Sequence, residues 1–167
     1  IDVTLQLVES TVANAALRAN DFDMYQSGFS LSLDPDERFS SAFVTGGGTN
    51  YGNWSDEEYD ALIVAARAEQ YFPEDPVTCL MKLRQFGELL AQQLAARLGL
   101  FVSVEEPQAD LLGRLRREGN LPREALDLFH DLRRVGNEAT HLHRGDHAAA
   151  MAALKIAHQG EEQRLVG

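Results

Sequence analysis

Residues 77–98 read VTCLMKLRQFGELLAQQLAARL, and leucines recur through this stretch at the spacing of one helical face. The face comprises Leu80, Leu83, Leu90, Leu94 and Leu98, and Gly99 follows as a typical helix terminator. Helical patterns also cover residues 109–118, a segment from Pro122 to about 143, and residues 147–158 after a capping Asp146. This part of the chain is therefore predicted to form an all-α bundle of four main helices.

Upstream of this bundle, residues 55–58 read SDEE, which has the form of a capping box. Ser55 can accept from the amide of Glu58, and the Glu58 carboxylate can reach back toward the first residue. The pattern predicts a helix from Ser55 to about Tyr71, before two prolines break the chain.

Residues 1–54 have a different character. Residues 1–9 alternate apolar and polar side chains, which predicts a strand, and residues 11–20 follow as a helix. Residues 24–32 predict a second strand, so the three segments make a β-α-β unit, and residues 33–54 form a long loop with three consecutive glycines. Two strands are too few for an independent sheet, so we expect an incomplete lobe here and an α+β fold overall.

Charge also differs between the two parts. Residues 1–68 hold 11 acidic and 3 basic side chains, and residues 69–167 hold 15 and 12, within a net charge of −11. The first part therefore lacks the cations needed to bind a nucleic-acid backbone. Cys79 is the only cysteine, which excludes an internal disulfide, and no apolar run is long enough to span a membrane. Because the chain begins at Ile1 without a leader, we expect a trimmed form or a fragment.

Residues 28–69 carry phrases such as DPD, GGGTNYG and YDAL. As a set they resemble a segment of the extracytoplasmic solute-binding proteins of peptide, dipeptide and nickel ABC transporters, and residues 1–68 would be part of one lobe. The resemblance implies a periplasmic or extracytoplasmic location and a peptide ligand, provided that a full lobe is completed. Aromatic walls and fixed polar groups suit such a cleft. The candidate ligand-binding residues are Phe29, Asp34, Asp36, Asn50 and Tyr51. The alternative is that the DPD phrase is only a turn and that the aromatic side chains only pack.

Residues 69–159 resemble a different family, with KLRQFGELLA and RRVGNEATH as the most distinctive phrases. They are similar to the HEPN-like helical domain of unknown function at the N-terminus of type I restriction enzyme R subunits and related helicases. Residues 160–167 form a polar tail. This resemblance implies an accessory or dimerisation module of a restriction- or helicase-type system, a cytoplasmic location and no cofactor.

One face of the predicted helix over residues 122–143 carries Arg134, Asn137, Glu138 and His141. HEPN ribonucleases use an Arg, a spacer and a His, so the resemblance makes Arg134, Asn137 and His141 candidate catalytic residues. Val135 follows Arg134, where those enzymes usually have a polar residue. The alternative is structural: Arg134 pairs with Glu138, the other two satisfy buried polar groups, and Gly136 permits a close helix–helix approach.

A possible anion-binding edge is the second candidate site of this part. A solvated face balanced by neighbouring carboxylates is the alternative interpretation, and the lack of interleaved aromatics argues against single-strand stacking. No metal site is predicted from the five histidines. The edge comprises Arg114, Arg116, Arg117, Arg123, Arg133 and Arg144.

These patterns leave three hypotheses for function. The first is a non-catalytic helical module whose arginine edge meets nucleic acid or a partner subunit, as a homodimer or a restriction-complex subunit. The second is a solute-binding protein fragment, and the third is a HEPN-type ribonuclease. The junction near residues 66–70 itself has three explanations: a natural recombination, an engineered join or a sequence-assembly error.

Overall fold

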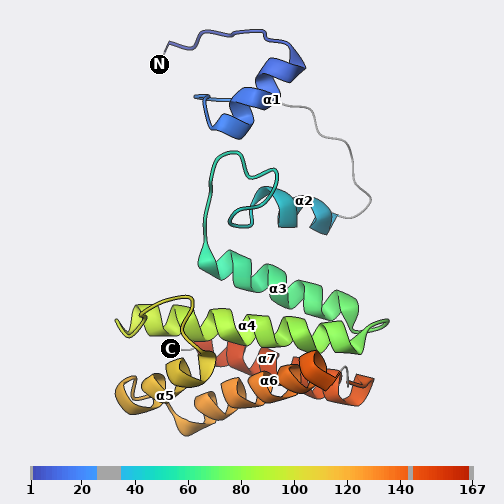
Figure 1. Cartoon of the computed structure of the whole chain (residues 1–167), viewed down its shortest axis with the longest axis vertical. Coiled ribbons are helices and arrows are strands. Elements are labelled where there is room, and N and C mark those ends of the chain that lie inside the picture. Colours follow the sequence, from blue (N-terminus) through green and yellow to red (C-terminus); the bar gives the residue numbers. More distant parts are fainter. Residues whose placement is uncertain (1, 26–34, 143–144, 166–167) are drawn as a thin grey trace. The chain divides into compact units, whose positions relative to one another are not determined.

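The computed structural model describes residues 2–25, 35–142 and 145–165 of the 167-residue chain. Within these ranges every regular element is a helix, from α1 to α7 (Figure 1). The chain divides into two compact units, Ile1–Asp56 and Glu57–Gly167. We call them the N-terminal unit and the helical unit and describe each by itself.

Helix α4 (Pro76–Arg97) is the central element of the helical unit. It packs against α3 (Glu57–Tyr71), α5 (Gln108–Glu118), α6 (Arg123–Leu142) and α7 (His147–Leu165). The all-α bundle predicted for this part of the chain is confirmed, and α3 joins it as an additional helix.

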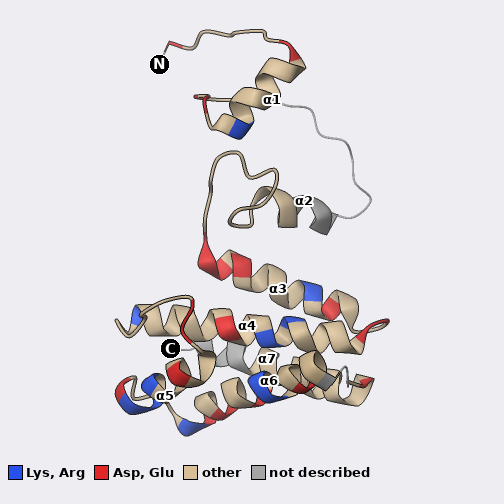
Figure 2. Cartoon of the chain, in the orientation of Figure 1, with Lys and Arg blue, Asp and Glu red and all other residues tan. Residues whose placement is uncertain are grey.

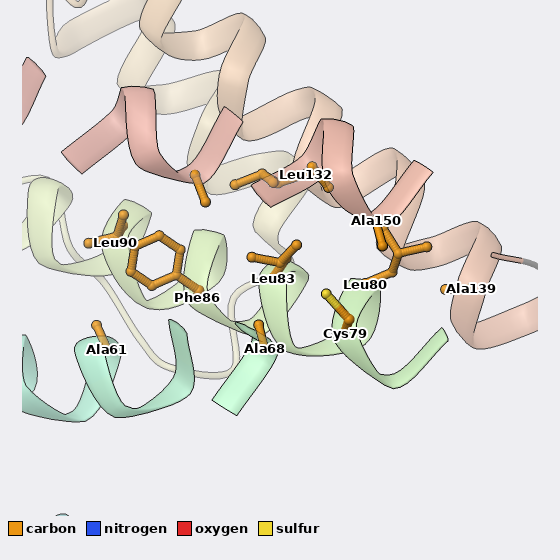
Figure 3. Close-up of a cluster of buried hydrophobic side chains, with 12 residues drawn as sticks. Ala61, Ala68, Cys79, Leu80, Leu83, Phe86, Leu90, Leu132, Ala139 and Ala150 are labelled. Carbon is orange, nitrogen blue, oxygen red and sulfur yellow. The ribbon is translucent and has the colours of Figure 1, made fainter. Parts of the chain in front are cut away.

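The leucine face of α4 builds the main core. Leu80, Leu83, Phe86 and Leu90 are buried between α3 on one side and α6 and α7 on the other (Figure 3). Leu98, by contrast, is 43 % exposed, because it lies just beyond the end of the helix. A second cluster joins α4 to α5 and α6 through Ala91, Ala95, Leu111, Leu112, Leu115 and Leu126.

Residues at or next to each end of α4 determine where the helix begins and ends. Asp75 caps the N-terminus, where its carboxylate accepts from the Thr78 amide at 2.9 Å, and Pro76 occupies the first turn. After the C-terminus, Gly99 adopts a φ of +69°, a conformation that favours glycine. This confirms the predicted helix terminator.

Helices α4 and α6 approach each other closely at Gly136. A Cβ atom at this position would overlap the Cβ of Arg84, and one at Gly87 would lie 3.2 Å from Leu132 Cδ1. The prediction that Gly136 permits a close helix–helix approach is confirmed.

Helix α3 begins at Glu57, two residues after the start predicted from the capping box. Ser55 instead lies 2.9 Å from Thr45, hydroxyl to hydroxyl. Ala61 and Ala68 of α3 are fully buried against the core of the helical unit. The domain boundary predicted between residues 68 and 69 therefore falls inside α3. That boundary rests on family resemblance, and it stays a prediction about where two sequence families meet.

The predicted β-α-β fragment of the N-terminal unit is wrong. Only the helix exists, as α1 (Ser10–Ala19), and the structure forms no strand over residues 2–9 or at Met24 and Tyr25. Residues 26–32 of the second predicted strand lie outside the described residues. Val3, Leu5 and Leu7 alternate as expected but are 76–90 % exposed, because a strand needs a hydrogen-bonded neighbour and a core to cover its apolar face. The overall class is therefore all-α in the described part, and the predicted long loop contains α2 (Pro35–Ala42).

In the described part of the chain, no helix combines the length and the apolar character that crossing a membrane requires.

Candidate functional site

The α6 face predicted to be catalytic holds its arginine in ion pairs. Arg134 Nη2 lies 3.4 Å from Asp131 Oδ1, and Nη1 lies 3.7 Å from Glu138 Oε1. These carboxylates stand one turn before and one turn after the arginine, so the predicted i,i+4 pair is present. Two carboxylates compete with any phosphate for the same guanidinium.

The other two residues of this face have different environments. Asn137 is half-buried, whereas His141 is exposed in the last turn of α6, so His141 does not satisfy a buried group between helices as the structural alternative supposed. Between them, the Thr140 hydroxyl donates to the Gly136 carbonyl at 2.8 Å. Arg134, Asn137 and His141 share one face of α6, but none of them lines the cavity described below.

Arg114 of the predicted anion-binding edge has a structural role. Its guanidinium donates to the Leu100 carbonyl at 2.9 Å and forms an ion pair with Glu106. The side chains of this pair are only 20 % and 10 % exposed, respectively. Arg114 therefore fixes the segment between α4 and α5 and presents no free cation.

The exposed arginines of the edge lie where α5 ends and α6 begins. Arg116 and Arg117 occupy the last turn of α5, and Arg123 opens α6; Figure 2 shows basic residues in this region of the two helices. Arg123 Nε lies 3.8 Å from Asp127 Oδ2. Arg133 is half-buried, and Arg144 lies outside the described residues. We call Arg116, Arg117 and Arg123 the arginine corner.

Asn50 closes the loop of the N-terminal unit. It is 9 % exposed, its amide nitrogen donates to the Val44 and Trp54 carbonyls at 3.0 and 2.6 Å, and its oxygen accepts from the Trp54 amide at 3.0 Å. These bonds engage both ends of the side-chain amide within the loop.

The remaining predicted ligand residues do not assemble into a described cleft. Tyr51 is half-buried, Asp36 lies in α2, and Phe29 and Asp34 lie outside the described residues. Phe43 contacts Phe39 and Trp54, with ring centroids 6.2 and 6.1 Å apart.

Cys79 is buried in the core next to the α3–α4 connection. Burial, and then the charges of Glu69 and Asp75, raise the pKa of its thiol to about 11. Such a thiol stays protonated at neutral pH and is a poor nucleophile. Among the described residues, no three His, Cys, Asp or Glu side chains are placed to hold a metal ion.

A cavity of about 400 Å³, which the sequence did not predict, lies between α4, α6 and α7. Its wall includes Phe86, Leu90, Phe129 and Ile156, with Gln93 as a polar member. Gln93 is only 8 % exposed and its Nε2 donates to the Glu57 carbonyl. One available signal was a glutamine in the leucine-rich pattern of α4.

Comparison with known proteins gives one significant relative among curated proteins. Over 95 residues, 56 % of this chain, the sequence is 38 % identical to the type I restriction enzyme EcoKI endonuclease subunit of Escherichia coli K12. The matched region covers only 8 % of that subunit. No protein-family model and no solved structure matches the chain.

This similarity supports the restriction-enzyme part of the resemblance. Nothing in the comparisons supports the solute-binding resemblance of residues 1–69, and in the described part the strands expected for a lobe are absent.

Proposed function

We propose that the helical unit is a non-catalytic accessory module of a type I restriction endonuclease subunit, acting in the cytoplasm. The observation that carries this proposal is the 38 % identity over 95 residues to a subunit with that name. The bundle supports it, because Arg134 on α6 is engaged by the carboxylates of Asp131 and Glu138.

The module would meet nucleic acid or a partner subunit through the arginine corner. Its three exposed cations stand together at one end of the bundle, at the α5–α6 connection. Asp127 lies 3.8 Å from Arg123, and Glu118 and Glu124 are close in sequence, so any phosphate contact would be weak and dependent on salt.

Salt-dependent binding tests this part of the proposal. We expect a fluorescein-labelled DNA duplex to bind the full chain at low salt, with log K falling by about 2–3 per unit of log salt for three phosphate contacts. Replacing Arg116, Arg117 and Arg123 by Gln should abolish the binding. Arg67→Gln, an exposed arginine on α3, is the matched control and should leave it unchanged. If the wild type does not bind the duplex at low salt, the arginine corner does not bind DNA, and only the partner-subunit part of the proposal would remain.

RNA cleavage tests the non-catalytic character. We expect purified chain to leave single-stranded RNA intact, since Arg134 is shared by Asp131 and Glu138. Cleavage that disappears in His141→Ala, with unchanged circular dichroism, would establish the ribonuclease alternative instead. Sedimentation velocity measures whether the chain dimerises by itself.

A further inference from the structure

The cavity between α4, α6 and α7 exists because two packed helices diverge. Helices α4 and α6 approach each other closely at Arg84 and Gly136 and also at Gly87 and Leu132. Toward the start of α6 they separate, as crossing helices do away from their contact point. Side chains of α5 fill one side of the separation, and the cavity occupies the side that faces Ile156 of α7.

The size and lining of this cavity suit a small molecule. Its volume of about 400 Å³ is within the range of ligand pockets, and aliphatic and aromatic side chains of three helices dominate its wall. A cavity with such an apolar lining holds water poorly and can accept apolar molecules.

Gln93 supplies a hydrogen-bond acceptor in the wall. Because its Nε2 donates to the Glu57 carbonyl, the other atom of the amide is the oxygen, and Oε1 can accept a hydrogen bond. Gln93 is more than nine-tenths buried and lines the cavity. A ligand in the cavity that carries a donor can therefore form a hydrogen bond with this oxygen.

The charges at the rim argue for an uncharged ligand. Arg97 lines the cavity, but its guanidinium lies 3.5 Å from the Glu58 carboxylate of α3. The pair carries no net charge, and the apolar interior penalises an ionised group.

We propose that this cavity is a binding site for an uncharged, mainly apolar small molecule that donates one hydrogen bond to Gln93 Oε1. The lining of this site includes none of the residues of the arginine corner and none of Arg134, Asn137 and His141 on α6.

Indole and benzofuran test the proposal on the full chain, because they share a shape but only indole carries an N–H donor. Calorimetric titration should show saturable binding of both compounds, with indole tighter by roughly two- to tenfold, the range for one neutral hydrogen bond. Gln93→Leu should remove the preference and keep benzofuran binding. Equal affinities for the wild type would show that Gln93 sets no donor requirement and would overturn the proposal.

Filling the cavity provides a second test that does not depend on Gln93. Ala125→Phe places a ring in the cavity and should reduce the affinity for both compounds at least tenfold. Ala152→Phe, at an exposed position of α7, is the matched control and should bind as the wild type does. Circular dichroism verifies that both variants fold. Failure of the wild type to bind either compound, or unchanged binding in Ala125→Phe beside a folded control, would refute the site.

Discussion

Helices α4 and α6 approach each other closely where Gly136 meets Arg84. Alanine favours a helix over glycine by about 1 kcal/mol, so local propensity alone would make Gly136→Ala stabilising. The structure predicts the opposite, because the added Cβ overlaps the Cβ of Arg84. We expect the free energy of unfolding to fall by about 1–3 kcal/mol, measured by urea denaturation followed by circular dichroism.

Gly113 of α5 is the matched control for this substitution. A Cβ at Gly113 meets only Arg117 Nη1, at 3.3 Å, which is the far end of a flexible side chain. Gly113→Ala should therefore raise the free energy of unfolding by about 0.5–1 kcal/mol. A stabilising effect at both positions would show that α4 and α6 are not in close contact at Gly136.

Because Cys79 is buried, we expect the protein to lose stability as the pH rises. Its pKa is raised from 9.0 to about 11 by burial, so the unfolded chain loses the thiol proton at a lower pH than the folded chain does. Between these values the unfolded state is favoured as the pH rises. We expect the melting temperature of the wild type to fall relative to that of Cys79→Ala across this window, measured in a series of melts.

Thiol labelling gives an independent readout of Cys79. At pH 8 a thiol-reactive disulfide reagent should label the folded chain far more slowly than the urea-unfolded chain. Rapid labelling of the folded chain would show that this part of the core opens readily.

At the scale of elements, the Arg114–Glu106 pair determines how the α4–α5 connection is held. Both side chains are largely buried, and Arg114 also donates to the Leu100 carbonyl. Arg114→Met leaves the Glu106 charge buried without its partner, so we expect a loss of about 3–5 kcal/mol in the free energy of unfolding. Replacing both residues by Met should recover much of that loss, and urea denaturation measures each variant.

Arg116→Met is the control for this prediction. Arg116 is two residues away on the exposed side of the same helix, and its replacement should change the free energy of unfolding by less than about 0.5 kcal/mol. If Arg114→Met behaves like Arg116→Met, the connection is held by apolar contacts alone.

The sequence predicted helices correctly where the signals for them lay within the helix itself or next to its ends. The leucine spacing of α4, the capping Asp146 before α7 and the terminator Gly99 are local signals, because helical hydrogen bonds close within a few residues. The strand over residues 1–9 failed because its hydrogen bonds would have had to come from another segment. The alternation of Val3, Leu5 and Leu7 gave the periodicity of a strand, but it did not identify a second segment to which such a strand could hydrogen-bond.

The same limit applies to the candidate sites. The spacing of Arg134, Asn137 and His141 correctly placed them on one face of α6. It did not indicate that Asp131 would also pair with Arg134 or that His141 would be exposed. Nor did the arginine pattern distinguish the structural Arg114 from the exposed Arg116, since the difference arises from Glu106 and Leu100 in another segment.

At the scale of the whole molecule, the position of the unit boundary makes a testable prediction. The helical unit begins at Glu57, so a chain of residues 57–167 should fold and melt as the bundle does in the full chain. A chain of residues 69–167 lacks Ala61 and Ala68, which are fully buried. We expect it to lose at least about 2 kcal/mol, or about 8–16 °C in melting temperature.

Differential scanning calorimetry of the two truncated chains measures this difference. Equal melting temperatures would show that α3 contributes nothing to the bundle and that the family boundary at residues 68/69 is also the structural one. A loss of folding in residues 57–167 would show that the bundle depends on the N-terminal unit.

The sequence by itself determined the helical character of residues 77–158, the ends of α4 and the glycine that lets α6 approach it. Each of these depends on neighbours within a turn or two, or on the size of a single residue. The tertiary structure decided that α3 belongs to the bundle, which arginines are engaged, and that a cavity remains beside Gln93. These outcomes depend on distances between segments far apart in the chain, and local periodicity carries no information about them.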